Sequence, residues 1–464
     1  MIRLAVLDEG ELNAVHDATL RILSEVGILL TLPEAINLLE GHGARRRSGR
    51  ILIPPDLVER SLELCPPRVA VRGRGGKAAI LGDGSLNWHN LGGARDVFEP
   101  DEGRSRPARL QDLRDSARLL DALDGATTVT PFFTPQDVPG GVMALSMYRH
   151  TLSNTVKPIH GPGIQTAFEV RYLARMAEVI GRCEETLTLG ISPVSPLTFT
   201  DGLVEALMET ARLGIPFGPL PCPTAGATAP MSLAGALAQQ NAEVLASIVI
   251  AQAVRPGLPM FYCGRLAFME PRSGVSVWGG PEIGLTSAAT VQIGHRYRLP
   301  VNVYGLSTNA LALDLRNGYE RSMNAIVPAL AGADELSGIG EMASGIAGSY
   351  AQMVLDNEIA AGTRRVRQGL RVDADSLAVA LIASVMDGAR NFLAEEHTVR
   401  YLRQGEVLYR KLFSDPTGTG DGLLQRVLSE TRRLLAEHKV PPLAQDQERE
   451  LDSLLEAAGR EAGL

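Results

Sequence analysis

The sequence predicts an α/β protein built on a TIM-like (β/α)8 barrel, with an N-terminal mixed α/β extension and C-terminal helices. From about residue 127 onward, short apolar runs alternate with longer helical runs, the pattern of parallel strands joined by crossover helices. Seven such strands can be read, which favours a closed barrel over an open doubly wound sheet. No G-x-G-x-x-G follows a strand, which disfavours a dinucleotide-binding fold.

Residues 1–125 are predicted to form a mostly helical extension with short strands. Apolar residues recur at helical spacing between Leu12 and Val26, and Gly27 ends this run. The segment ILIPPDLVERSLELCPPRVAVRG indicates a strand, a helix and a strand, because proline pairs separate its apolar runs. The segment from Arg109 to Gly125 is an amphipathic helix that leads into the barrel.

Residues 126–394 are predicted to form the barrel. The strand candidates are TTVTPFFTP, KPIHGPG, TLTLGISPVSP, IPFGPLPCPTAG, LPMFYCG, LPVNVYG and ELSGIGEM. Helical runs begin near residues 141, 166, 201, 232, 281 and 317, between successive strands. We expect the eighth strand in the stretch after Asp356. Residues 395–464 are expected to form helices that pack on the barrel exterior.

Composition argues against several classes of protein. The net charge is −8 and basic residues cluster only at residues 45–47, so a nucleic acid is not an expected partner. The N-terminus lacks the apolar segment of a signal peptide, and no apolar window is long enough to span a membrane. Cys65, Cys183, Cys222 and Cys263 are far apart, which favours free thiols over disulfides or a zinc site. We therefore expect a cytoplasmic protein, and one that self-associates.

The loops after the strands are the expected ligand site, because barrel enzymes bind their ligands there. Aromatic faces can hold a desolvated quaternary ammonium, and aromatic residues at or near the strand ends are Phe132, Phe133, Tyr262 and Tyr304. Ordinary core packing is the alternative for each ring. Strand alternation in LPVNVYG places Asn302 and Tyr304 on the face that lines the barrel interior.

Four further polar residues are candidates for the site. His160 is either a ligand contact or a satisfied barrel histidine, and Arg272 either binds a substrate carboxylate or is an exposed loop residue. Glu282 follows a helix-starting proline, so its carboxylate either contacts the ligand or complements the helix dipole. Glu341 ends the last strand, and its alternative is a surface salt bridge.

The helix after the loop PCPTAGATAP carries unusual polar residues. Ser232 is its expected N-cap, and Gln240 falls on its apolar face with Asn241 and Glu243 beside it. A buried amide must be hydrogen-bonded or it costs about 1–3 kcal/mol. These three residues are therefore either a structural clamp between helix and strand or a network that supports the ligand site from behind.

Several segments together resemble the trimethylamine methyltransferase family of corrinoid-dependent methyltransferases. The similar N-terminal segments are HDATLRILSEVGI, LLEGHGA and IPPDLVERSLELCPPRV. The most specific segment is TAGATAPMSLAGALAQQNAEVLASIVIAQAVRPGLPMFYCG, followed by MEPRSG, GGPEIGLTSAATVQIGHRYRLPV, NGYE and DNEIA. Their order and spacing carry the resemblance over most of the chain.

The resemblance implies a TIM-like barrel that moves a methyl group from an amine to the cobalt of a separate corrinoid protein. Founding members contain pyrrolysine, whereas this chain has only standard residues and resembles the non-pyrrolysine branch, which includes glycine betaine methyltransferases. The position equivalent to pyrrolysine is expected in ADELSGIGEM. The implied partners are a small quaternary amine and a corrinoid protein, with no metal and no tightly bound cofactor in the chain itself.

Two other functions remain open from the residues. One is a barrel lyase or isomerase that uses Glu282, Glu341 or His160 as a general base. The other is a non-catalytic protein that binds a methylated amine or betaine. A quaternary amine needs no protonation to release its tertiary amine, so the methyltransferase hypothesis requires no catalytic triad.

Overall fold

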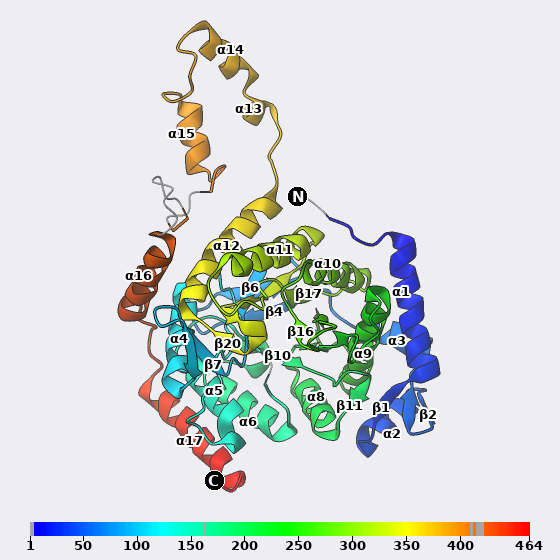
Figure 1. The fold of residues 1–464 in the computed structure, drawn as a ribbon. Coiled ribbons are helices and arrows are strands. Elements are labelled where there is room, and N and C mark those ends of the chain that lie inside the picture. The colour runs from blue at the N-terminus through cyan, green and yellow to red at the C-terminus, as the bar shows by residue number, and fades with distance from the viewer. Residues whose placement is uncertain (1–3, 162, 409–411, 414–421) are drawn as a thin grey trace.

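A computed structural model describes residues 4–161, 163–408, 412–413 and 422–464 (Figure 1). The N-terminal elements are α1 (Glu9–Arg21), a π-helical turn (Ile22–Val26), β1 (Ile28–Leu30), α2 (Pro33–Gly41), β2 (Arg45–Arg47), β3 (Arg50–Leu52), α3 (Pro55–Glu63), β4 (Val69–Arg72) and β5 (Ala78–Leu81). Helix α1 begins at a capping box made by Asp8 and Glu11. Both α1 and α3 pack against the long helix α9 (Leu233–Val254).

The central strands are parallel and short. They are β6 (Asn87–Asn90), β9 (Ile159–Gly161), β10 (Leu187–Ile191), β12 (Phe217–Pro219), β14 (Tyr262–Gly264), β17 (Val301–Tyr304) and β18 (Glu335–Ile339). Two ladders form, one in the order β14-β17-β18-β6 and the other in the order β12-β10-β9. A bridge from Phe217 to Met260 connects the ladders on one side.

On the other side, the segment around Val129 lies between the two ladders. Val129 forms a parallel bridge with Ile159 of β9, and the Thr127 amide donates to the Trp88 carbonyl of β6 over 2.8 Å. The predicted strand TTVTPFFTP is therefore mostly irregular and pairs through single bridges at Val129 and Phe133. The other predicted strands are confirmed.

The eighth strand was predicted in the wrong place. The stretch after Asp356 belongs to helix α12 (Tyr350–Gln368), and the strand that pairs with β18 is β6, from the N-terminal region. The four residues of β6 are all buried, because β18 flanks the strand and Leu336 pairs with Trp88. The domain division at residues 125 and 394 stays a prediction, although this sheet crosses the first of those boundaries.

Helices follow the strands along the chain, as predicted. They are α4 (Leu110–Ala122), α5 (Met143–Ser153), α6 (Ala167–Glu178), α7 (Cys183–Thr186), α8 (Asp201–Leu213), α9, α10 (Pro281–Arg296), α11 (Leu315–Ala331) and α12. Neighbours along the chain pack side by side, as α8 does on α9 and α10 on α11. Helix α9 is long and apolar enough to cross a membrane, but 83% of its apolar window is buried inside the protein.

Short strands at the carboxyl ends of the central strands form small hairpins and rim contacts. They are β7 (Asp96–Glu99), β8 (Arg104–Pro107), β11 (Thr198–Phe199), β13 (Thr224–Ala225), β15 (Ala267–Met269), β16 (Ser276–Val277), β19 (Glu341–Met342) and β20 (Ala347–Gly348). The β19–β20 pair follows β18 directly, and β20 continues onto β7 and β8. Loop segments are thereby fixed above the barrel interior.

The C-terminal helices divide into two groups. Helices α16 (Gly422–Glu437) and α17 (Gln445–Glu461) pack on α4, α12, α5 and α6. Helices α13 (Ala374–Leu377), α14 (Val379–Asp387) and α15 (Glu396–Arg403) instead project away from the body (Figure 1). We call residues 369–408 the helical arm.

Candidate active site at the strand ends

Strand register arranges the inward-facing side chains in layers. Asn302 of β17 lies opposite Glu335 of β18, and Tyr304 lies opposite Ser337, two residues further along both strands. Because side chains alternate along a strand, Asn302 and Tyr304 point to the same face, as predicted. The lower layer therefore contains the amide of Asn302 and the carboxyl of Glu335. The upper layer contains the aromatic ring of Tyr304 and the hydroxyl of Ser337.

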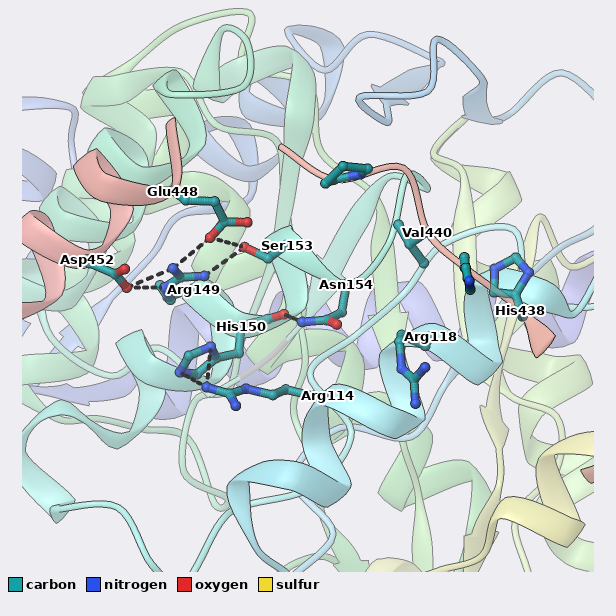
Figure 2. Close-up of a pocket in the computed structure, with 12 residues that line it drawn as sticks. Arg114, Arg118, Arg149, His150, Ser153, Asn154, His438, Val440, Glu448 and Asp452 are labelled. Atoms are coloured by element: carbon teal, nitrogen blue, oxygen red, sulfur yellow. Dashed lines mark hydrogen bonds and ion pairs between the residues drawn. The ribbon is translucent and has the colours of Figure 1, made fainter. Parts of the chain in front are cut away.

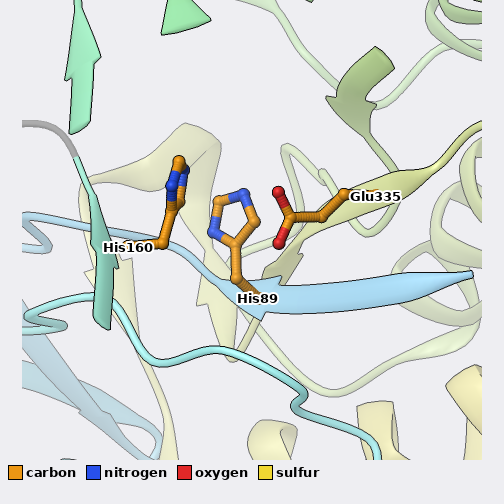
Figure 3. Close-up of side chains that lie close together, drawn as sticks. All are labelled: His89, His160 and Glu335. Carbon is orange, nitrogen blue, oxygen red and sulfur yellow. The ribbon is translucent and has the colours of Figure 1, made fainter. Parts of the chain in front are cut away.

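A buried polar cluster, which we call the floor, lies between the central strands, where His89, His160 and Glu335 come close together (Figure 3). Asn302 Nδ2 donates to Glu335 Oε2 over 2.5 Å and contacts His89 Nε2 at 3.0 Å. His160 Nδ1 lies 2.7 Å from the hydroxyl of Thr188. Burial raises the pKa of Glu335 to about 7 and lowers that of His160 to about 3, so this histidine is neutral.

The ligand atoms of His89, His160 and Glu335 lie within 4.8 Å of one another, which is close enough to hold a metal ion. His160 Nδ1, His89 Nε2 and both oxygens of Glu335 already have protein partners, however, and Glu335 Oε1 accepts from Thr128 over 3.0 Å. The charge of the nearby Arg265 guanidinium further lowers the pKa of both histidines and would oppose a bound cation. We interpret the cluster as a hydrogen-bonded floor.

Arg265 is a buried, positively charged residue beside this cluster. It directly follows β14, is 5% exposed, and donates to Gly264 O and Asn302 O over 3.1 Å each and to Ser337 Oγ over 3.0 Å. It also donates to Asn302 Oδ1. Within the described residues, no carboxylate forms an ion pair with it. The charge of Arg265 acts on the carboxyls of Glu335 and Glu341, but neither contacts it directly, so this guanidinium is suited to pair with an incoming anion.

Two aromatic rings stand above Arg265. Its guanidinium carbon lies 4.7 Å from the ring centre of Tyr304, and the ring of Trp278 meets Tyr304 edge-on at 5.2 Å. Both rings are only partly buried, so they border space at the carboxyl ends of the strands. A cation could therefore lie against aromatic surface close to the guanidinium.

Glu341 lies near the same rings. It is 1% exposed, which excludes the surface salt bridge, and its Oε2 has no hydrogen-bond partner. Burial raises the pKa of its carboxyl to about 8, and its charge contributes to raising the pKa of Tyr304. An unpaired buried carboxyl oxygen close to an aromatic ring is a second polar group available to a ligand.

A fully buried ion pair fixes the loops beneath Glu341. Arg321 Nη1 lies 2.9 Å from Asp356 Oδ2, and neither side chain is exposed. The same arginine donates to Leu306 O over 2.7 Å, and the same carboxylate accepts from the Gly340 amide over 2.7 Å. The pair therefore holds together the chain segments that leave β17 and β18.

The other three candidate aromatic residues lie in packed surroundings. The ring of Phe132 packs on glycine backbone, because a Cβ at Gly348 would lie 2.0 Å from it. Phe133 packs edge-on against Phe132 at 4.6 Å. Tyr262 faces the helix layer, where its hydroxyl donates to Asn241 Oδ1 over 3.0 Å. Of the four candidate rings, Tyr304 is the one placed beside Arg265.

Arg272 and Glu282 are both exposed, and neither contacts the interior cluster. The Arg272 amide donates to Glu270 in the turn between β15 and β16. Glu282 lies in the first turn of α10, after Pro281 at N1, where its charge complements the helix dipole. The structure thus separates these two residues from Asn302, His160, Tyr304 and Glu341.

The polar residues of α9 brace neighbouring elements. Glu243 accepts from Ser195 Oγ over 2.7 Å and from the Leu197 amide over 2.9 Å, which holds the loop after β10. Gln240 donates to Thr290 of α10, and Asn241 donates to Thr19 and Tyr297. Ser232 occupies the N-cap position without a side-chain cap bond. These contacts hold α9 to α1 and α10, as expected for a structural clamp. Glu243 also holds α9 to the loop that follows β10.

Two of the cavities in the described part of the chain lie away from this interior cluster. One of about 570 Å³ lies between α4, α5 and the C-terminal segment, where Arg149 pairs with Glu448 and Asp452 (Figure 2). Another, of about 450 Å³, lies at the amino ends of the strands beside Pro300 and Asp334. Neither contains a predicted site residue.

Arg265, Trp278, His89 and Glu335 were not singled out from the sequence. Extending the alternation of β14 from Cys263 would have pointed Arg265 inward, and the same alternation in β18 places Glu335 with Ser337. His89 could not be found this way, because its strand was not recognised. Trp278 lies after β16 and carries no periodic signal.

Comparison with known proteins identifies the family. The family model described as trimethylamine methyltransferase (MTTB) matches residues 1–463. The chain belongs to the trimethylamine methyltransferase family. This confirms the resemblance inferred from the ordered segments.

Relatives within the family match over nearly the whole chain. The trimethylamine methyltransferase MttB of Desulfitobacterium hafniense is 29% identical, over 99% of this chain and 95% of the relative. A glycine betaine methyltransferase of the same species is 27% identical, over 99% and 98%. The solved monomethylamine methyltransferase of Methanosarcina barkeri is similar in fold, with a TM-score of 0.50, 11% identity and coverage of 98% of this chain and 87% of that one.

Proposed function

We propose that the chain is a (β/α)8-barrel enzyme that moves a methyl group from a carboxylate-bearing quaternary amine to the cobalt of a corrinoid protein. The observation that carries this proposal is Arg265, a buried guanidinium without a carboxylate partner in the described structure, 4.7 Å from the ring centre of Tyr304. A zwitterion such as a betaine offers an anion and a cation a few bonds apart. Both halves therefore find complementary groups in one place.

The carboxylate of the donor would pair with Arg265, where a planar guanidinium can bind it bidentately. Its ammonium would then lie against Tyr304 and Trp278, with the unpaired Glu341 Oε2 as a polar neighbour. Simple methylamines lack the anionic half and would leave Arg265 uncompensated. The arrangement thus favours betaines over choline or trimethylamine.

Access to this region is supported by Cys222, which follows β12. The residue is exposed, yet desolvation by the surrounding protein raises the pKa of its thiol to about 11, and the charge of Arg265 acts on it. Because Cys222 is exposed and lies close enough to Arg265 to be affected by its charge, we infer that the site is entered past this residue.

The reaction needs little from the protein beyond placement. The corrinoid of the partner supplies a cobalt nucleophile, whose electron pair forms the bond to the methyl carbon. The carbon–nitrogen bond breaks and its electrons stay on nitrogen, which leaves as a neutral tertiary amine without a proton. Arg265, Tyr304 and Trp278 would orient the donor and exclude water.

The relatives support this proposal through their names, which include both trimethylamine and glycine betaine methyltransferases. We further propose that the corrinoid is carried by a partner protein rather than held here, and that the enzyme works in the cytoplasm. The position equivalent to pyrrolysine remains assigned to ADELSGIGEM, which contains Glu341. Phe132, Phe133 and Tyr262 would support this site from outside.

The test is a methyl-transfer assay with cob(I)alamin and a panel of donors. Glycine betaine, carnitine and proline betaine carry a carboxylate, whereas choline and trimethylamine do not. We expect methylcobalamin from at least one carboxylated donor and much less from the others. Absence of methyl transfer from every donor, with and without a corrinoid protein, would contradict the proposal.

The same panel separates the two alternatives. Calorimetric binding of a betaine without methyl transfer would favour a non-catalytic binding protein. A lyase or isomerase would instead need a base that can accept a proton. His160 is bonded in the floor and Glu282 is exposed, which leaves Glu341 as the base to substitute in such a test.

A further inference from the structure

The helical arm, residues 369–408, exposes an unusual amount of apolar surface. Residues 376–386, SLAVALIASVM, contain no charge, yet most of them are exposed. Six large apolar side chains along the arm are between 46% and 86% exposed, namely Leu370, Val379, Ile382, Met386, Leu393 and Leu402. A helix with such a surface normally packs against protein.

The arm is nevertheless an ordered unit. Arg400 of α15 donates to Asp375 Oδ1 of α13 over 2.7 Å, and Tyr401 donates to Asp375 Oδ2 over 3.0 Å. Val385 of α14 is buried within the arm. These contacts brace the arm while its outer surface stays uncovered, so it is presented in a defined shape.

A second apolar surface lies on the body of the same chain. A cavity of about 740 Å³ runs between α11 and α12 beside the end of the arm, and we call it the α11–α12 groove. Its lining includes Leu315, Tyr319 and Val366, which are 94%, 57% and 42% exposed. Figure 1 shows the helices of the arm projecting beyond this body, while Leu408 at the end of the arm returns to line one end of the groove.

The areas fit an interface between two chains. The arm side chains named above together expose on the order of 700 Å² of apolar surface, if a large side chain contributes about 150–200 Å² in full. The largest apolar patch of a typical monomer is about 300–600 Å², and a standard interface buries about 800 Å² on each partner. A two-fold pairing would bury the arm and the groove of both copies at once.

We propose that the helical arm docks into the α11–α12 groove of a second copy of this chain, in a reciprocal dimer. This inference does not depend on the proposed methyl transfer. Both complementary surfaces are present on one chain, which is what a closed two-fold contact requires. A corrinoid protein or a lipid surface on the arm would be a different occupant, and the test separates them.

Sedimentation of the full-length chain at about 20 μM tests the proposal. We expect the unaltered protein to sediment as a dimer or a multiple of it. An arm variant, Ile382→Asp with Leu393→Asp, should become monomeric, and so should a groove variant, Tyr319→Glu with Val366→Glu. The control variant Arg403→Gln changes an exposed polar residue of the same arm and should not alter the assembly. Circular dichroism must show that each variant is folded.

Mixing the two defective variants gives the sharper result. Each mixed dimer contains one intact arm and one intact groove, so dimers should partly reappear. A photocrosslinker at position 393 should attach to α11 or α12 of another copy. A monomeric unaltered protein, mixed variants that stay apart, or a crosslink to another surface or protein would each overturn the proposal.

Discussion

Arg265 and Tyr304 stack at the ends of two neighbouring central strands, with the guanidinium carbon 4.7 Å from the ring centre. One comes from the end of β14 and the other from the end of β17, and these strands are hydrogen-bonded neighbours. The contact therefore follows directly from the strand register. It brings a cation and an aromatic face together at the carboxyl ends of the strands.

Replacing Arg265 by Gln should impair use of carboxylated donors. A charge-assisted hydrogen bond contributes about 1.5–3 kcal/mol, so kcat/KM should fall roughly 10- to 100-fold, mainly through KM. Arg296→Gln, at an exposed position, is the control, and it should change kcat/KM by less than about twofold. If Arg272→Gln has the large effect instead, the original sequence prediction holds and the assignment to Arg265 is wrong.

Replacing Tyr304 by Leu should weaken binding of the ammonium group. A desolvated cation–π contact is worth about 0.5–2 kcal/mol, so the Kd for a betaine should rise roughly 3- to 30-fold. Tyr304→Phe keeps the ring and should bind nearly normally. Calorimetry measures both. Equal losses in the two variants would show that the hydroxyl, rather than the ring face, matters.

The pKa of Glu341, raised to about 8 by burial, predicts a pH-dependent affinity. The carboxyl is neutral at pH 7 and becomes negative as the pH rises through about 8, so binding of a quaternary amine should tighten between pH 7 and 9. Glu341→Gln should remove this rise. Glu335 titrates near 7 and is less suited to explain it, so Glu335→Gln should keep the rise. If the affinity of the unaltered protein for the quaternary amine does not change between pH 7 and 9, Glu341 does not lie beside the donor.

Glu335 should lower stability as the pH rises. Its folded-state pKa of about 7 lies above the unfolded value of 4.5, so its protonated form favours folding and the benefit is lost between about pH 4.5 and 7. Glu335→Gln should remove this loss, which is at most roughly 3 kcal/mol. Urea denaturation at pH 5 and pH 8 measures it. A variant equally pH-sensitive as the unaltered protein would contradict the prediction.

The buried Arg321–Asp356 pair should be costly to break. Asp356→Asn leaves a buried guanidinium without its counter-charge and should destabilise the fold by about 3–5 kcal/mol in urea denaturation. The matched control is Asp56→Asn, which removes an exposed pair with Arg60 and should cost less than about 1 kcal/mol. Similar losses in the free energy of unfolding for both variants would show that the buried pair contributes no more to stability than the exposed pair.

Helices and most strands could be predicted because their periodic patterns are long or are bounded by Gly and Pro. Strand β6 could not, since NWHN is four residues long, has three polar residues, and becomes a strand only by pairing with β18, almost 250 residues away. Such a partner leaves no local signal. The predicted place for the eighth strand, after Asp356, was therefore a guess from the repeat count.

The candidate site shows the same limit. Asn302 and Tyr304 were placed correctly, because alternation within one strand decides which way they point. Among the described residues, Arg265 has no direct ion pair with a carboxylate, and Tyr262 is turned to the helix layer by its hydrogen bond to Asn241. Both depend on neighbours from other elements, which a single sequence does not specify.

The base of the arm is anchored by Arg367, which donates to Ala333 O over 2.6 Å and to Gly84 O over 3.3 Å, just before β18 and β6 begin. The arm thus departs from the end of the molecule opposite the aromatic rim. Pairing through the arm and the α11–α12 groove uses none of the rim residues Arg265, Tyr304 and Trp278, so it would leave the rim of each copy uncovered. Each subunit could then bind its own copy of the proposed corrinoid protein at the same time. The number of sites that work at once would therefore rise with the number of subunits in the assembly.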